Sequence, residues 1–558
     1  MGVIDLSVIA IFTFIVVSCG LSFSGAGKSL SGFFSAGGAL PWWMSGLSLF
    51  MSFFSAGTFV VWGSIAYSYG WVAITIQWTM CIAGLLIGFF IAGKWQATQV
   101  LTAAEFIKIR LGLRVQKVYT VTFLIISTFS TGTFLYPVAK IVQVSTGIQI
   151  TETIIILGLI ILAYTAVGGL WAVIVTDILQ FVVLTAAVLI VVPLALDRIG
   201  GLNEFIQQAP EDFFAPVAGE FTWSFIFAFG LFNLFFIAGN WAYIQRFTCV
   251  STPKDAKKVA WLFAALYLVS PLIWMIAPMV YRLINPNLSI SEAEGAYLLM
   301  CQEVLPAGML GLIVAGMVFA TSSSINTALN ITAGVITNDV YRILRPKSSE
   351  SHLVFVGRLA TVLLGFGTIT VALLVPFLGG VVNVVMTMAA LTGGALFLPP
   401  VWLLFSRFQT GTSILATTFI SLSVNIFFKF ISPTLFNITL NRTEEMLLGV
   451  LLPALLLAIF EWRLRVRGHE APGHKKIGEF SAEKIHEKNS SNLETKNTTE
   501  NNRGIRVIAI GISAVGLTMF ILGVTAETGT LIITTMGLAI TAIALILLGK
   551  DKLFSRSN

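Results

Sequence analysis

Long apolar runs separated by short polar segments repeat along almost the entire chain. Each run is close to, or longer than, the roughly 20 apolar residues that a helix needs to cross a bilayer. The runs predict fifteen helices, over residues 3–21, 43–66, 72–93, 118–147, 151–168, 171–196, 222–245, 258–284, 305–336, 353–378, 380–405, 411–433, 446–462, 505–524 and 528–549. We therefore expect an all-α polytopic membrane protein.

Two of these helices contain small and polar residues at membrane depth. Helix 43–66 carries Ser52-Phe53-Phe54-Ser55-Ala56-Gly57-Thr58, and helix 222–245 carries Ala238-Gly239-Asn240. Lipid cannot satisfy freed backbone groups, so a break there is tolerated only where it lines a cavity. The ends of half-helices attract ions and polar substrates. The alternative is a small-residue face for close helix packing.

The two interrupted helices are five helices apart in the predicted order. Two halves with an odd number of spans each must lie in opposite orientations, which is the inverted repeat of many transporters. The predicted parts are a leading helix and loop (1–42), a first repeat (43–217), a second repeat (218–405), two peripheral helices (406–467), a polar, mobile cytoplasmic linker (468–503), and two C-terminal helices with a basic tail (504–558).

Helix 305–336 has the densest polar stripe of the sequence. Ser323, Asn326, Thr327 and Asn330 recur at three- and four-residue steps and therefore share one face. Such a stripe is typical of a cation site or of polar packing between helices. Lys140 also lies at membrane depth, where ionisable groups are costly. It is a candidate partner for a substrate carboxylate, or a lysine that reaches the outer interface or a carbonyl.

Composition and charge agree with this topology. Of 558 residues, 56% are hydrophobic and 11% charged, which excludes a soluble enzyme, a disulfide-stapled domain and a disordered chain. The charged loops after odd-numbered helices are basic, which predicts an outside N-terminus and a cytoplasmic C-terminus in the plasma (inner) membrane. We expect a non-enzymatic protein, monomeric or weakly oligomeric, whose partners are the bilayer and a small solute, without nucleic acid.

The segment Gly168-Gly169-Leu170-Trp171-Ala172-Val173-Ile174-Val175-Thr176-Asp177-Ile178-Leu179-Gln180 resembles the signature of the sodium:solute symporter family. Three other stretches look similar, at residues 52–63, 102–112 and 323–341. The resemblance implies a LeuT-like five-plus-five inverted repeat with one leading and about four trailing helices. It also implies a sodium-coupled secondary active transporter that imports a small polar solute by alternating access.

The resemblance implies site residues as well. The main sodium site would use the carbonyls of Met51, Phe54 and Ala320 and the hydroxyls of Ser323 and Ser324. A second sodium site would use Asp177, Ser323, Asn326 and Thr327, where asparagine replaces a hydroxyl of the family pattern.

The family's sugar-binding positions correspond to Thr58, Gln77, Ser130, Asn233, Tyr267 and Met386, and its gating tyrosine corresponds to Phe236. Here Tyr267 replaces a basic residue and Met386 a glutamine, which argues against the same sugar bound in the same way. A sugar or polyol, an organic acid and an amino acid remain open as substrates. A transporter-like solute sensor and a passive channel are the alternative functions.

Overall fold

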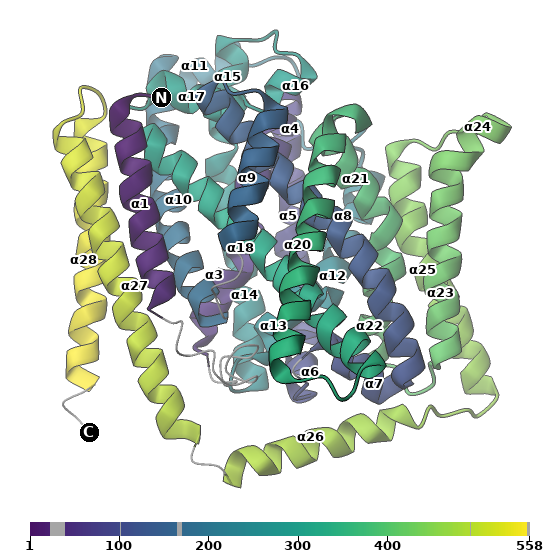
Figure 1. Cartoon of the computed structure of the whole chain (residues 1–558). Coiled ribbons are helices and arrows are strands. Elements are labelled where there is room, and N and C mark those ends of the chain that lie inside the picture. Colours follow the sequence, from purple (N-terminus) through teal and green to yellow (C-terminus); the bar gives the residue numbers. More distant parts are fainter. Residues whose placement is uncertain (23–39, 101, 165–169, 491–492, 555–558) are drawn as a thin grey trace.

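The computed structural model describes residues 1–22, 40–100, 102–164, 170–490 and 493–554. Regular structure in these residues is helical, apart from two isolated bridges between single residues. Figure 1 shows the helices as one bundle, with α1, α27 and α28 at one edge and α23 and α25 at the other. The fold class predicted from the sequence is confirmed.

The helices of the first half of the chain are α1 (Val3–Leu21), α3 (Trp42–Met51), η3 (Thr58–Trp62), α4 (Gly63–Tyr69), α5 (Val72–Phe90), α6 (Ala92–Ala97), α7 (Ala103–Leu111), α8 (Leu113–Thr146), α9 (Ile150–Tyr164), α10 (Leu170–Arg198) and α11 (Leu202–Gln208). Those of the middle are α12 (Trp223–Gly239), α13 (Trp241–Thr248), α14 (Pro253–Trp274), α15 (Ile276–Ile284), α16 (Ile290–Ala293), α17 (Ala296–Val304), α18 (Met309–Val335), η4 (Ile336–Tyr341), α19 (Arg342–Leu344), α20 (Glu350–Leu374), η5 (Val375–Leu378), α21 (Gly380–Thr392), η6 (Gly393–Phe397) and α22 (Leu398–Leu403). The remainder are α23 (Gly411–Ile426), η7 (Phe427–Ile431), α24 (Ser432–Phe436), α25 (Arg442–Val466), α26 (Gly473–Ser490), α27 (Leu493–Val524) and α28 (Thr530–Phe554).

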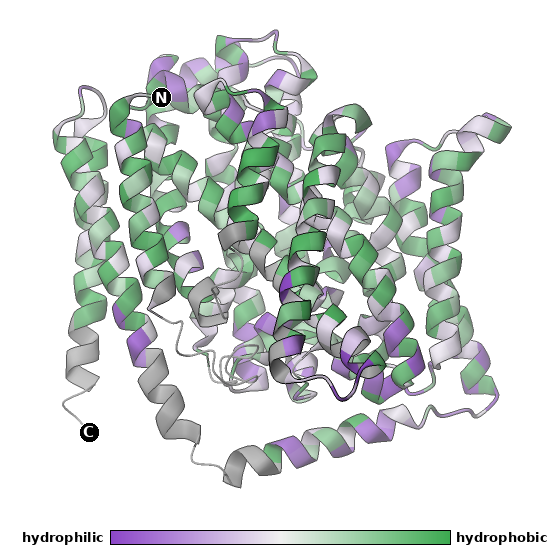
Figure 2. Cartoon of the chain, in the orientation of Figure 1, coloured by the Kyte–Doolittle hydropathy of each residue, from purple (hydrophilic) through white to green (hydrophobic). Residues whose placement is uncertain are grey.

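Every predicted span contains a helix or an interrupted helix. Among the described residues, ten helices are long and apolar enough to cross a membrane, or eleven if the bent pair α12–α13 is one span. Figure 2 shows the apolar band of these helices, with polar residues gathered mainly toward the two ends of the bundle. The total of fifteen spans stays a prediction.

Both predicted interruptions are present. Helix α3 ends at Met51, and regular helix resumes beyond Ser55. Between α12 and α13 the chain bends by 60°. A glycine is needed at this bend, because a Cβ atom on Gly239 would lie 2.0 Å from the carbonyl oxygen of Phe397. Asn240 then caps α13, with its side-chain oxygen accepting from the amide of Ala242 at 3.0 Å.

Residues 473–490, within the predicted polar linker, form helix α26. Ile477 and Phe480 pack against the hydrophobic core, and the hydroxyl of Ser481 donates to the carbonyl of Thr98 at 2.9 Å. These few apolar positions give an otherwise polar segment one face to bury, which is enough to order a helix against a folded surface. In Figure 1, α26 lies across one end of the bundle, beside α7.

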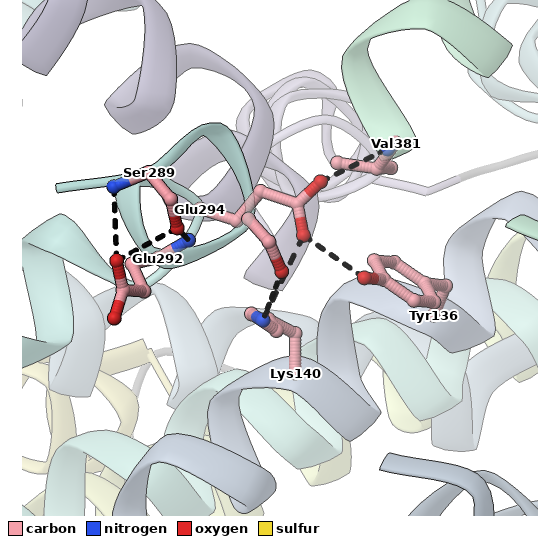
Figure 3. A network of polar contacts seen from close by, with 7 residues as sticks. Tyr136, Lys140, Ser289, Glu292, Glu294 and Val381 are labelled. Carbon is pink, nitrogen blue, oxygen red and sulfur yellow. Dashed lines mark hydrogen bonds and ion pairs between the residues drawn. The ribbon is translucent and has the colours of Figure 1, made fainter. Parts of the chain in front are cut away.

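A buried polar network joins three parts of the opposite end of the bundle (Figure 3). Glu294, which follows α16 and is 3% exposed, accepts from the hydroxyl of Tyr136 on α8 at 2.9 Å. Its other oxygen accepts from the amide of Val381, at the start of α21, at 3.0 Å. Lys140 lies 4.0 Å from the same carboxylate and donates to Ser291 at 3.2 Å. The protein thus supplies Lys140 with an internal anion.

Removing either partner of this buried pair should destabilise the protein, because the other charge stays buried without its partner. Lys140→Met leaves the Glu294 carboxylate buried without its cation, and Glu294→Gln leaves the ammonium without its anion. Removing one partner of a buried pair costs about 3–5 kcal/mol. We expect a lower melting temperature for each single variant and a smaller loss for the double variant than the sum of the two. Glu303→Gln is the control, since its pair with Arg198 is exposed and contributes at most about 1 kcal/mol.

The difference in stability between Lys140→Met and the native protein should be smaller at acidic pH than at neutral pH. Burial raises the pKa of the Glu294 carboxyl above its ordinary value. A raised pKa in the folded state means that stability rises as pH falls and declines as pH rises above the ordinary value. Loss of the cation raises this pKa further, so the difference between variant and native protein should narrow toward acidic pH. A pH-independent difference in melting temperature would contradict this account.

Candidate ion and solute site

The break after α3 is held open by hydrogen bonds that a continuous helix would not make. The amide of Ser55 donates to the side chain of Thr58 at 3.2 Å, and the amide of Thr58 donates to the carbonyl of Ser55 at 3.0 Å. In an α-helix these two amides would bond the carbonyls four residues earlier, which belong to Met51 and Phe54. The two predicted ion-binding carbonyls are therefore released from helical bonding.

The break lies directly against α18. The amide of Ala56 donates to the hydroxyl of Thr321 at 3.0 Å, and that hydroxyl donates to the carbonyl of Met317 at 2.9 Å. One turn along, the hydroxyl of Ser324 lies 3.5 Å from the carbonyl oxygen of Ala320. The structure thus brings the broken helix beside the part of α18 that carries two predicted ion ligands. The side chains of Ser323, Asn326 and Thr327 lie outside the described part of the structure.

One cavity next to the break contains two charged residues, and we call it the charged cavity. Its volume is about 90 Å³, and its polar lining includes Ser52, Asp177, Arg246, Ser324 and Asn240. Asp177 is 5% exposed and accepts from the hydroxyl of Ser48 on α3 at 2.5 Å. The predicted residues Asp177 and Ser324 therefore share one cavity with the break.

A second cavity of about 150 Å³ lies on the other side of Ser52 and Phe236, and we call it the neutral cavity because its lining includes no Asp, Glu, Lys, Arg or His among the described residues. Six of the seven predicted substrate residues line it: Thr58, Gln77, Ser130, Asn233, Phe236 and Tyr267. Met386 does not, and Met388 does. Two positions along an α-helix differ by about 200°, so Met386 is on the opposite face of α21.

The polar groups of the neutral cavity differ in how far the protein satisfies them. The hydroxyl of Thr58 donates to the carbonyl of Phe53, so it stabilises the break. The amide nitrogen of Asn233 donates to Thr79 at 2.8 Å. The amide oxygen and nitrogen of Gln77 are both buried and have no partner within the described structure. Gln77 therefore has two polar atoms that a ligand in the neutral cavity could hydrogen-bond.

Aromatic side chains separate the two cavities. Phe134, Phe236 and Tyr243 line both. The ring of Tyr243 lies 4.7 Å from that of Phe53 and 5.4 Å from that of Phe236, measured between centroids. Sequence reasoning identified Phe236 but missed Phe53 and Tyr243, which read as ordinary apolar positions. The predicted break at Asn240 could have indicated Tyr243, because a residue just past a break can face the same cavity as the break.

A helical bundle with two broken helices, whose breaks meet buried cavities, is typical of secondary transporters. The family model of the sodium:solute symporter family matches residues 33–412, and the chain belongs to that family. It is therefore a multi-pass membrane protein that uses sodium to transport a small solute.

Known relatives agree with this assignment. The chain is 28% identical over 414 residues to a sodium/glucose cotransporter of Vibrio parahaemolyticus, covering 68% of this chain and 76% of the relative. It is 28% identical over 402 residues to the human sodium/myo-inositol cotransporter 2, covering 64% of this chain and 59% of the relative. It thus spans about three fifths of the mammalian relative's length. The structure of a Na⁺-coupled sialic acid symporter in a substrate-bound outward-open state superposes with a TM-score of 0.68 at 21% identity, covering 82% of this chain and 97% of that one.

Removing the Thr321 hydroxyl, which accepts a hydrogen bond from the Ala56 amide, should weaken ion binding. Thr321→Val leaves that amide buried without an acceptor, at a cost of about 1–3 kcal/mol, and the break should shift away from α18. We expect the sodium concentration that gives half-maximal thermal stabilisation to rise several-fold. Ser322→Ala is the matched control, because Ser322 donates to the carbonyl of Val318 within its own helix. Equal sodium dependence in both variants would contradict the role given to Thr321.

Proposed function

We propose that this protein imports a neutral polyhydroxylated solute, a sugar or polyol, together with sodium by alternating access. The observation that carries the solute class is the neutral cavity, where both polar atoms of Gln77 are buried and unpartnered in the described structure. An unmade bond at a buried polar atom costs about 1–3 kcal/mol. A pair of neighbouring hydroxyls offers Gln77 a donor and an acceptor at once.

The rest of the neutral cavity supports the same solute class. Its walls carry Trp62, Phe232, Tyr267 and other aromatic rings, whose flat apolar faces suit the C–H faces of a sugar or cyclitol ring. A carboxylate or ammonium group would be buried there without a counter-charge, at a high cost. Organic acids and amino acids are therefore less favourable substrates than neutral polyols. The relatives include cotransporters named for glucose and for myo-inositol.

For the ion, we propose the site implied by the family resemblance. The released carbonyls of Met51 and Phe54, the carbonyl of Ala320 and the hydroxyls of Ser323 and Ser324 would surround sodium with oxygen atoms. Carbonyls at the ends of broken helices are a recurrent way to coordinate sodium in transporters. A second ion would use Asp177 with Ser323, Asn326 and Thr327, next to the charged cavity.

We also propose the orientation given by the basic loops. The end of the bundle with α7 and α26 would face the cytoplasm, and the network around Glu294 would lie outside. In this orientation the charged cavity lies on the cytoplasmic side of the aromatic side chains that separate it from the neutral cavity. Sodium would then pass Asp177 on its way inward.

Uptake into proteoliposomes tests the function directly. Labelled glucose, myo-inositol, proline and lactate are offered with an inward sodium gradient or with choline in its place. We expect sodium-driven accumulation of a neutral polyol above its external concentration, and loss of that uptake in Ser324→Ala. Uptake that is unchanged in choline would refute sodium coupling, and uptake that stops at equal concentrations would indicate a passive channel.

The role of Gln77 has its own test. Gln77→Leu keeps the size of the side chain but removes both polar atoms, so we expect the apparent affinity for the polyol to fall at least tenfold while sodium-dependent thermal stabilisation persists. Gln116→Leu is the matched control: Gln116 is also buried with an unpartnered amide oxygen, but it lines neither cavity. Preference of the native protein for proline or lactate would overturn the proposed solute class.

A further inference from the structure

Arg246 is a buried cation in the charged cavity. It lies on α13, just past the 60° bend at Asn240, and is 3% exposed. Its Nε and Nη1 atoms are buried and have no hydrogen-bond partner within the described structure. The hydroxyl of Ser45 donates to its backbone carbonyl at 2.7 Å, which fixes this turn of α13 to α3.

A guanidinium ion removed from water needs an anion or several acceptors to offset its lost hydration. Asp177 is the one acidic residue among the described residues that line the charged cavity. Asp177 is held from the α3 side by the hydroxyl of Ser48. The cavity therefore places one carboxylate within the same small enclosure as one arginine, at the edge of the proposed ion path.

We propose that Arg246 is an internal counter-cation that competes with sodium for Asp177 and takes its place when sodium leaves through the charged cavity. This rests on the proposed sodium coupling. Departure of sodium removes a positive charge from beside the buried Asp177 carboxylate, and the cost of that loss holds the ion back. A nearby guanidinium lowers that barrier, because it can neutralise the carboxylate with paired N–H donors as the ion departs.

The position of Arg246 connects this exchange to the movement of the bent helix. Arg246 belongs to α13 and Asp177 to α10, and both are tied to α3, through Ser45 and Ser48, so a movement that breaks either bond alters their separation. In a state that separates Arg246 from Asp177, sodium can bind the Asp177 carboxylate. In a state that brings the two together, Arg246 displaces the sodium ion. Arg246 would thereby favour release over rebinding without touching the solute.

The test compares R246Q and R246K with the native protein. Sodium affinity is measured from thermal stabilisation of purified protein titrated with NaCl at constant ionic strength with choline chloride. R246Q removes the competing charge, so we expect sodium to bind about tenfold more tightly, and R246K to lie between R246Q and the native protein. In proteoliposomes, net solute efflux should slow in R246Q, whereas exchange between two sodium-loaded compartments should persist.

Arg110 provides the matched control, because it is also 3% exposed with unpartnered Nε and Nη1 atoms but lies outside both cavities. R110Q should leave sodium affinity unchanged. In a D177N background, R246Q should no longer tighten sodium binding, since the shared carboxylate is gone. If R246Q does not fold, R246K carries the test by the same titration.

Unchanged or weaker sodium binding in R246Q and R246K would overturn the proposal. Slowed exchange in proportion to net efflux would also overturn it, because a merely structural role would impair both. A native protein with no response to sodium would instead refute the sodium coupling on which the proposal depends.

Discussion

The architecture of the site depends on a single exchange of hydrogen bonds at the break after α3. There the amides of Ser55 and Ala56 donate to the hydroxyls of Thr58 and Thr321, and the amide of Thr58 donates to the carbonyl of Ser55. Each such bond releases a carbonyl that a continuous helix would occupy. Because nothing in lipid could satisfy these carbonyls, the break can exist only inside the protein and beside a polar neighbour. Thr321 on α18 is that neighbour, and the two helices therefore stabilise each other.

The sequence was sufficient to predict the helical class from its apolar runs and the family from the segment 168–180. It also predicted both breaks, because small and polar residues stand out within apolar membrane helices. It did not predict the partner of Lys140, since Glu294 lies 154 residues away and meets it only through packing. Arg246 directly follows the predicted helix 222–245 and therefore read as a loop charge, because the sequence predicts the bend at Asn240 but not the direction of the residues beyond it. Helix α26 was missed because its few apolar residues become significant only against α7.

The two cavities differ in the charge of their lining. The neutral cavity offers hydrogen bonds and aromatic faces without charge, whereas the charged cavity has an acid and a base without a comparable set of solute contacts. The residues that line both cavities form their shared boundary; they are Ser52, Ser130, Phe134, Phe236 and Tyr243. Under the proposed function, the ion and the solute would experience different electrostatic environments, although the two cavities share Ser52.

Helix α26 has a mechanical consequence for the whole bundle. Its 18 residues form a rod of about 27 Å that contacts the loop before α7 through Ser481 and leads toward the C-terminal pair α27–α28 (Figure 1). A rod resists stretching far more than it resists pivoting. A movement of the loop before α7 would therefore shift α26 as a unit rather than stretch it.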